Sequence, residues 1–160
     1  GSEMCIRDRW SCNNLYWYLT HACSPVTDGL MPYREADLLR NILDRADAAL
    51  KEGKNQATLR FGHESCLLPL VALLELNHYG ESYPDVEKLS EQWRAYDIFP
   101  MASNVQFVFF HKKGSNDVLV KVLLNEKEAK LPVKTDVAPY YHWKDVESYY
   151  REKLDKYQHI

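Results

Sequence analysis

The apolar positions of residues 33–52 recur at the spacing of an α-helix, and this segment is the most clearly predicted element of the chain. They fall on one side of such a helix, while charged residues fill much of the remainder. Gly53 follows the last apolar position, where a glycine commonly ends a helix. The pattern therefore predicts an amphipathic helix. Its apolar stripe consists of Leu38, Leu39, Ile42, Leu43, Ala46 and Leu50.

Other segments also have helical patterns. Residues 10–24 are rich in aromatic side chains, and residues 140–157 place large apolar side chains at helical spacing. Residues 66–76 are apolar almost throughout, which predicts a buried helix with Pro69 in its first turn. A shorter helix is expected at residues 86–89.

The second half of the chain contains the pattern of a β-hairpin. Residues 105–111 and 118–124 are rich in β-branched and aromatic side chains, and a polar loop containing glycine joins them. Residues 57–62 are a weaker strand prediction, and residues 131–133 a weak edge segment. The order of elements predicts an α/β fold, with a mixed sheet flanked by helices. So few strands make a thin sheet, which suggests that other strands of the sheet are missing.

The composition is typical of one globular domain. The chain has 160 residues, of which 46% are hydrophobic, and a net charge of −3. This charge, without a Lys/Arg cluster, argues against nucleic acid as a partner. The longest apolar run, residues 66–74, contains a proline and is too short to span a membrane, so no membrane partner is expected either.

The first nine residues carry no periodic pattern and are set apart as an artefactual or tag-derived leader, with Gly1-Ser2 typical of a tag remnant. Without Cys5, three cysteines remain, and none has the spacing of a metal site. Free thiols, mostly buried, are the favoured interpretation. A disulfide between Cys12 and Cys23 stays open as an alternative.

The run Gly62-His63-Glu64 places an imidazole and a carboxylate where the predicted strand gives way to a helix, and open α/β sheets bind ligands at strand ends. Gly62 permits close approach of a ligand. His63 can donate hydrogen bonds to a phosphoryl oxygen, and the N–H groups at the helix start can hold an anion. The helix dipole favours ionised Glu64, whereas a bound phosphate favours the protonated acid, so proton donation is expected in the substrate complex.

The alternative for this pair is structural. His63 and Glu64 would then cap the helix, where a carboxylate near the N-terminus is favourable. A single His-Glu pair is a weak motif, so these residues alone favour capping.

The surrounding sequence, however, resembles a known family. Residues 59–70 (LRFGHESCLLPL) resemble the C-terminal catalytic motif of the histidine acid phosphatase branch of the histidine phosphatase superfamily. The similarity is greatest to its bacterial phytase-like and multiple inositol polyphosphate phosphatase group, and it covers about residues 10–157. Four other segments share the resemblance. They are residues 14–20, 24–26, 101–109 and 131–136.

This resemblance implies hydrolysis of phosphomonoesters through a phosphohistidine intermediate, with no metal or other cofactor. By position, His63 matches the histidine that binds the phosphate, and Glu64 matches the proton-donating carboxylate of an HD motif, with Glu in place of Asp. In an HAE motif the carboxylate would fall at position 65, where this chain has Ser65. Arg60, Gly62 and Ser65 are further candidates for contact with a small-molecule phosphate ester, such as an inositol phosphate.

The nucleophilic histidine of that family lies in an Arg-His-Gly-x-Arg motif, and none of the six histidines of this chain has that context. The resemblance therefore implies the C-terminal part of a longer enzyme, with the missing N-terminal part of the same enzyme as its partner. Residues 10–55 would belong to a helical cap domain and residues 56–160 to the last part of the α/β domain. Such a chain is expected to be inactive alone, because phosphate monoesters hydrolyse very slowly without catalysis.

Three further points follow from the same resemblance. A non-catalytic phosphate-binding or interaction module of the same fold is the alternative function. A parent enzyme typical of the family would be periplasmic or secreted. Phytate and simpler esters both stay open as substrates, because the basic residues that grip a polyphosphorylated ring are expected mainly in the missing half.

Overall fold

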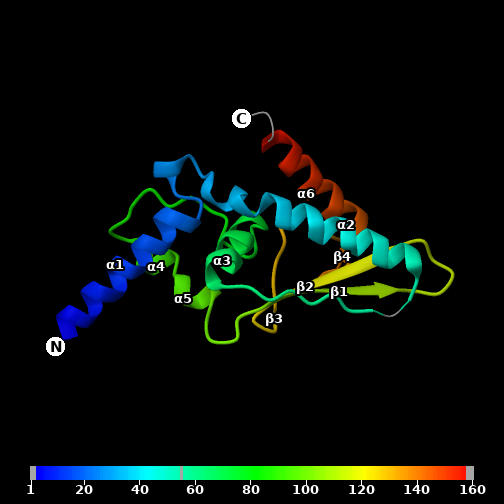
Figure 1. Ribbon diagram of the computed structural model, residues 1–160, viewed down its shortest axis with the longest axis horizontal. Helices are drawn as coiled ribbons and strands as arrows, with labels where there is room; N and C mark the ends of the chain where they lie inside the picture. Colours follow the sequence, from blue (N-terminus) through cyan, green and yellow to red (C-terminus); the bar gives the residue numbers. More distant parts are fainter. Residues whose placement is uncertain (1–2, 55, 158–160) are drawn as a thin grey trace.

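The computed structural model describes residues 3–54 and 56–157, and these contain six α-helices, two 3₁₀ segments and four strands (Figure 1). Gly1 and Ser2, expected to be a tag remnant, lie outside the described residues. The helices are α1 (Glu3–His21), α2 (Ala36–Glu52), α3 (Glu64–Leu73), α4 (Leu89–Gln92), α5 (Ala95–Ile98) and α6 (Trp143–Tyr157). The 3₁₀ segments are η1 (Pro25–Thr27) and η2 (Met31–Glu35). The strands are β1 (Val105–His111), β2 (Val118–Leu124), β3 (Lys127–Glu128) and β4 (Tyr141–His142).

The sheet is built around β2, which pairs with each of the other strands. β1 and β2 form the predicted hairpin, in register from Val105 opposite Leu124 to His111 opposite Val118. β3 and β4 pair with the other edge of β2, which leaves β1 as an edge strand of the described sheet. Every pairing is antiparallel. The α/β class with flanking helices is confirmed, as are the two long strands, whereas the edge predicted at residues 131–133 is wrong because β4 takes that edge.

The predicted helices are present with shifted ends. α1 begins at Glu3, so residues 3–9, set apart above, continue this helix with exposed side chains. α6 begins only at Trp143 because the two preceding residues form β4. The short helix predicted at residues 86–89 is wrong in position, since α4 starts at Leu89, its buried residue. Gly53 ends α2 in the left-handed conformation, as predicted, with φ 62°.

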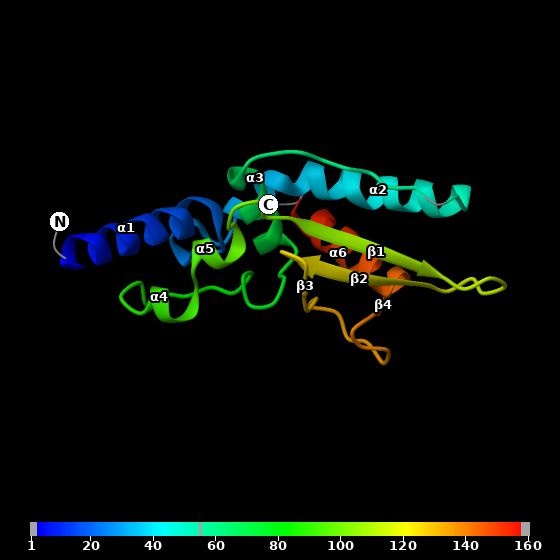
Figure 2. The ribbon, with the colours of Figure 1, turned by 90° about the horizontal axis from the view of Figure 1, so that it is seen from below.

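α6 packs against both the sheet and α2, and its contact with α2 is strongly polar (Figures 1 and 2). Arg151 pairs with Asp44 at 2.9 Å and with Asp47 at 3.0 Å, and the indole N–H of Trp143 donates to Asp47 at 2.8 Å. The two helices therefore meet through these charged and polar side chains, a contact called here the α2–α6 joint. α1 projects from one end of the molecule, and the β1–β2 loop projects from the other. None of the helices in the described ranges has the length and apolarity needed to cross a lipid bilayer.

α3 is the most deeply buried helix, as its apolar sequence predicts. Every residue from Leu68 to Leu73 is buried. The helix begins at Glu64, earlier than predicted, so Pro69 lies inside it rather than in its first turn.

The carboxyl end of α3 is closed by a turn centred on Glu75. The Glu75 N–H donates to the Ala72 carbonyl at 3.1 Å, and the Leu76 N–H donates to the Val71 carbonyl at 3.2 Å. These bonds define a Schellman stop, in which the left-handed position usually holds glycine. Here Glu75 takes that conformation, with φ 53°.

α6 supplies side chains that complete this stop. The Lys153 ammonium donates to the Leu73 carbonyl at 2.7 Å, and the Tyr150 hydroxyl donates to the Leu74 carbonyl at 2.8 Å. The Glu75 carboxylate lies 3.3 Å from Lys153 and accepts a hydrogen bond from the Tyr149 hydroxyl. Water cannot reach the last carbonyl groups of a buried helix, so they need protein donors. Here side chains of α6 supply those donors to the end of α3.

The cysteines differ from their predicted burial. Cys12 and Cys66 are exposed, so the prediction of mostly buried thiols is wrong. Cys12 and Cys23 are not joined in a disulfide. Cys23 is half-buried, and this burial raises the pKa of its thiol to about 11.

Gly80 packs directly on the turn that ends α3, and we expect Gly80→Ala to destabilise the protein. An added Cβ would lie 2.8 Å from the Glu75 Cα and 2.9 Å from the Ala72 carbonyl oxygen, and backbone atoms cannot move aside easily. The expected loss in the free energy of unfolding is about 1–3 kcal/mol, measured by urea denaturation. Gly62→Ala is the matched control, because its Cβ would meet only the Cys66 Cβ, at 4.0 Å. Equal stability of the two variants would contradict this account.

Asn14 is a buried amide that fastens α1 to the segment between α4 and α5. Its Nδ2 donates to the Trp93 carbonyl at 3.0 Å, and its Oδ1 accepts from the Ala95 N–H at 2.8 Å. Asn14→Ala would leave two buried backbone groups without partners, so we expect a loss of about 2–3 kcal/mol in unfolding free energy. The exposed neighbour Asn13→Ala is the control and should stay within about 0.5 kcal/mol of the parent. Thermal unfolding followed by circular dichroism measures both.

Candidate active site

The segment before α3 is irregular, so the strand predicted at residues 57–62 is wrong. Its alternate side chains Leu59 and Phe61 are 76% and 93% exposed. A strand needs a neighbour to accept and donate its backbone hydrogen bonds, and within the described residues all strand pairings belong to β1–β4. Among the described residues, no strand pairs with this segment, and its apolar side chains stay exposed.

This segment runs back along α2 before it enters α3 (Figures 1 and 2). Two side-chain contacts hold it there. Gln56 Nε2 donates to the Ala49 carbonyl at 3.3 Å, and Arg60 Nη2 donates to Asn41 Oδ1 at 2.8 Å. Arg60, predicted to contact substrate or to point away, is thus directed toward α2.

His63 occupies the N-cap position of α3. Its backbone is extended, with φ −106° and ψ 165°, and its carbonyl accepts hydrogen bonds from the N–H groups of Cys66 and Leu67. Its imidazole makes no capping hydrogen bond. The capping alternative therefore holds for the backbone of His63 and is wrong for its side chain. Glu64 is the first residue of the helix, where the dipole favours its negative charge.

The side chains of His63 and Glu64 are exposed, and Ser65 is half-buried. Within the described residues, neither His63 nor Glu64 has a side-chain hydrogen bond or ion pair, so both are available to a ligand. Gly62 leaves space beside them. The first N–H groups of a helix have no acceptor within the helix, so the start of α3 combines these donors with one imidazole and one carboxylate. Such a set can hold an anion and exchange a proton with it.

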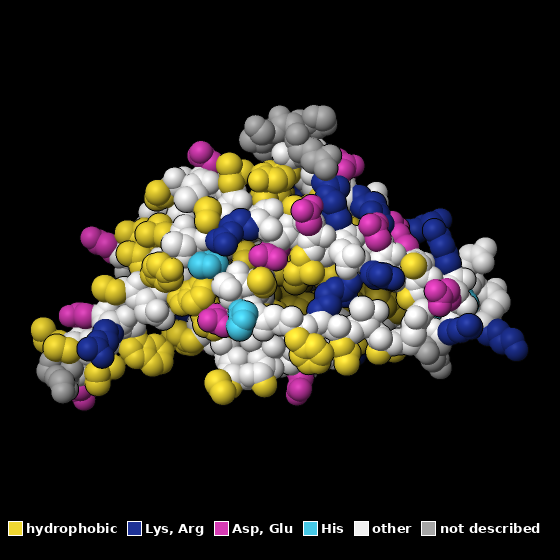
Figure 3. Space-filling view, viewed as in Figure 1, with side chains coloured by type: hydrophobic (Ala, Val, Ile, Leu, Met, Phe, Trp, Pro, Cys, Tyr) yellow, Lys and Arg dark blue, Asp and Glu magenta, His cyan; other side chains and the backbone are white. Residues whose placement is uncertain are grey.

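Apolar side chains lie uncovered on the face that Figure 3 shows. They gather near the middle of this face and toward α1, while Lys and Arg side chains gather over the half that holds α2 and α6. Leu59, Phe61 and Met101 are among the most exposed large apolar side chains of the described residues.

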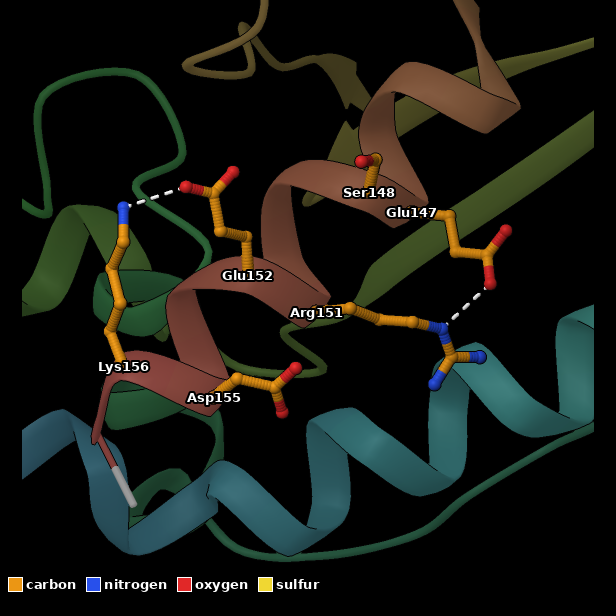
Figure 4. A pocket seen from close by; sticks show the side chains of 6 residues that line it. All are labelled: Glu147, Ser148, Arg151, Glu152, Asp155 and Lys156. Carbon is orange, nitrogen blue, oxygen red and sulfur yellow. Dashed lines mark hydrogen bonds and ion pairs between the residues drawn. The ribbon is translucent and has the colours of Figure 1, made fainter. Parts of the chain in front are cut away.

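A shallow hollow along α6 does not fit a ligand site. Its charged groups already pair with one another, since Arg151 Nε lies 2.6 Å from Glu147 and Lys156 Nζ lies 2.8 Å from Glu152 (Figure 4). Asp155 pairs with Arg40 of α2 at 3.3 Å. The hollow is therefore the outer surface of the α2–α6 joint.

His21 has a packing role. It is buried, its ring lies 4.6 Å from that of Trp17, and its Nδ1 lies 2.6 Å from Thr20 Oγ1. Burial lowers the pKa of His21, and the nearby charge of Arg34 lowers it further. Both effects favour the neutral form of the ring.

A second histidine cluster was not found from the sequence. His142 contacts the carboxylates of both Asp117 and Asp136. Asp117 is 25 residues away in the chain, and the pairing of β4 with β2 brings the two together. No spacing motif could have indicated a cluster that depends on this sheet register.

Comparison with known proteins identifies a family. Residues 30–125 match the family described as the histidine phosphatase superfamily (branch 2). This match covers more than half of the chain and includes the start of α3.

Individual relatives agree with this match. Multiple inositol polyphosphate phosphatase 1 of Homo sapiens is 28% identical over 134 residues, which cover 76% of this chain and 27% of the human protein. The Bifidobacterium longum multiple inositol polyphosphate phosphatase, in its crystal structure with inositol hexasulfate, is 28% identical with a TM-score of 0.62, over 71% of this chain and 25% of that one. Its apo form supports the fold, with a TM-score of 0.73 at 24% identity over 87% of this chain and 30% of that one. This chain spans about a quarter of the length of these relatives.

The exposed segment before α3 predicts a preferred cleavage site. We expect limited chymotrypsin digestion to cut first after Phe61 or Leu59, because both side chains are exposed on irregular backbone. Phe61→Ser should slow this first cut, and Phe107→Ser should not, because Phe107 is half-buried in β1. Mass spectrometry of the first fragments measures the outcome. A first cut inside β1 would contradict the exposure described for residues 57–62.

Proposed function

Because this chain belongs to branch 2 of the histidine phosphatase superfamily, we propose that it forms part of a phosphomonoesterase in which His63 binds the phosphate and Glu64 donates the proton. The observation that carries this proposal is the start of α3. An imidazole and a carboxylate stand there side by side, exposed and without protein partners among the described residues, next to open backbone N–H groups. This arrangement has the groups required to bind the phosphate of an ester and to protonate its leaving oxygen.

His63 would hold the phosphoryl group. A protonated imidazole donates hydrogen bonds from both ring nitrogens, and the helix start adds backbone donors and a partial positive charge. These donors match the oxygens of a phosphate, whose negative charge is spread over the same atoms. Binding at this point would place the ester oxygen near Glu64, the next residue.

Glu64 would protonate the leaving oxygen. An alkoxide leaves poorly, so a proton delivered as the P–O bond breaks lowers the barrier. The negative phosphate beside Glu64 favours the protonated carboxyl, which makes the acid available when substrate is bound. Ser65 stands at the other position that a carboxylate takes in this family, and a hydroxyl cannot serve as this acid at mildly acidic pH.

Inositol phosphates are the substrate class that we favour. The human and Bifidobacterium longum relatives described above are named for inositol polyphosphates, and one was crystallised with inositol hexasulfate. Gly62 would leave room for the ring of such a substrate, since an added Cβ there has no neighbour closer than 4.0 Å. Arg60 would contribute only after leaving Asn41, because its guanidinium now donates to that residue.

The nucleophilic histidine would lie outside this chain, in the N-terminal part of the same enzyme. None of the six histidines follows Arg and precedes Gly. The exposed apolar side chains of Leu59 and Phe61 support a missing partner, because a neighbouring strand would both pair with this segment and cover them. Without the nucleophile, the chain alone would be inactive. As a typical member of its family, the parent enzyme would act in the periplasm or outside the cell.

Phosphate release from phytate and from nitrophenyl phosphate, at mildly acidic pH, tests these roles. We expect turnover only when the chain is extended upstream of Trp10 to include the Arg-His-Gly motif. In that extended protein, Glu64→Gln should lower kcat for phytate by about 10²–10⁴-fold. The loss should be much smaller for nitrophenyl phosphate, because nitrophenolate leaves readily without a proton. His63→Ala should reduce turnover of both substrates.

Two controls separate the alternatives. Glu87→Gln removes an exposed carboxylate outside α3 and should leave both activities unchanged. The double variant Glu64→Ala, Ser65→Glu moves the carboxylate by one position and should regain activity only if position 65 can also serve. Equal losses on both substrates would contradict proton donation by Glu64. Phosphate binding through His63 without turnover, in the extended protein, would indicate a non-catalytic binding module instead.

A further inference from the structure

His142 lies between two carboxylates from different parts of the chain. Its Nδ1 is 3.0 Å from Asp117 Oδ2, and its Nε2 is 2.9 Å from Asp136 Oδ1. Asp117 immediately precedes β2, Asp136 belongs to the loop before β4, and His142 itself ends β4. The imidazole of His142 on β4 therefore contacts both the base of the β1–β2 hairpin and the loop of residues 132–140.

This geometry requires a particular protonation state. Ionised carboxylates only accept hydrogen bonds, so both ring nitrogens must carry a proton to donate to Asp117 and Asp136. Neutral imidazole has one proton, and its second nitrogen would present a lone pair to a negative oxygen. The two contacts exist together only when His142 is imidazolium.

We propose that His142 is a pH-operated tie: as imidazolium it holds the loop of residues 132–140 onto the sheet, and its deprotonation releases that loop. At the ends of this loop, the ring of Tyr140 packs on Phe110 of β1 and Val133 packs against the core, whereas the middle of the loop around Asp136 is exposed. Most of its own hydrogen bonds are internal, such as those from Thr135 Oγ1 to the Tyr140 carbonyl and from the Tyr140 N–H to the Val137 carbonyl. Asp136 is 82% exposed, and among the described residues His142 is the side chain that its carboxylate contacts.

The other charged groups on the surrounding elements do not replace this tie. Lys121 of β2 lies 3.3 Å from Glu128 and over the ring of Tyr140, and so is already engaged. Among the described residues, the side chains of Lys144 and Asp145 at the start of α6 form no hydrogen bond with His142. In the loop itself, Lys134 carries the other charge, and Lys130 lies just before the loop.

The direction of the pH dependence follows from the two partners. Hydrogen bonds to Asp117 and Asp136 raise the pKa of His142 above its ordinary 6.5. The tie is therefore complete below pH 6.5 and is lost as pH rises through the raised value. The His142 hydrogen bond holds the pKa of Asp136 below its ordinary 3.8, so the tie also weakens when pH falls through that lower value. It should act across the mildly acidic range.

Nuclear magnetic resonance and hydrogen exchange on the full chain test the tie. The ring of His142 should titrate above 6.5, and Asp117→Asn and Asp136→Asn should each lower that midpoint. Protection of backbone amides in residues 132–140, corrected for intrinsic exchange, should fall about tenfold between pH 5.5 and pH 8.5. Amides of α3 should show no comparable loss.

His142→Gln keeps a hydrogen-bond donor but cannot titrate, so its loop protection should not depend on pH. His111→Gln is the matched control on the same sheet, because His111 contacts the Ser115 carbonyl rather than a carboxylate, and it should behave like the parent. A His142 midpoint at or below 6.5 in the parent protein would overturn the proposal, even if a variant failed to fold. So would an equal change in loop protection in the parent and in His142→Gln.

Discussion

The helical part of this fold depends on the closure of one buried helix end by side chains of another helix. α3 is almost entirely apolar, so burying it favours folding, but burial also removes water from its last carbonyl groups. Lys153 and Tyr150 of α6 donate to two of those carbonyls, and Glu75 turns the chain while binding Lys153 and Tyr149. Without these partners, each buried carbonyl would cost about 1–3 kcal/mol. The positions of α3 and α6 are therefore linked, and α2 follows through its charged joint with α6.

This linkage fixes one side of the candidate active site and leaves the other side open. The start of α3 is set by the buried body of the helix, so the direction of its dipole and of its N–H groups is determined within this chain. The residues that lead into it are held by two side-chain hydrogen bonds to α2, and among the described residues the side chains of Leu59 and Phe61 are left largely exposed. His63 lies between the buried helix and the exposed segment that precedes it. Its backbone position comes from α3, while the surroundings of its imidazole would come from whatever covers residues 57–62.

Local patterns predicted the elements that need only local information. The hairpin of β1 and β2 was predicted with its bounds, because β-branched and aromatic side chains mark both strands and a polar loop separates them, and α2 followed from its apolar stripe. Residues 57–62 were also predicted as a strand, but a strand exists only with a partner, and the sequence of one segment does not contain that partner. Glu75 was not foreseen as a helix stop, since glycine is the usual residue at a left-handed position. The motif around His63 was predicted as a site, and its position at a helix start was correct. The pairing of His142 with two carboxylates required the register of β4 on β2.

The α2–α6 joint also determines when the molecule can complete its fold during synthesis. The bond from Trp143 to Asp47 spans 96 residues, and that from Arg151 to Asp47 spans 104. A ribosome adds about 5–20 residues per second, so α2 waits roughly 5–20 s for the helix that pairs with it. During that interval the apolar stripe of α2, with Leu39 and Leu43, lacks the contacts that α6 provides in the folded protein. The hairpin needs no such delay, because its strands emerge in succession. This chain therefore passes through a stage, set by its topology, in which a nascent amphipathic helix needs protection from aggregation.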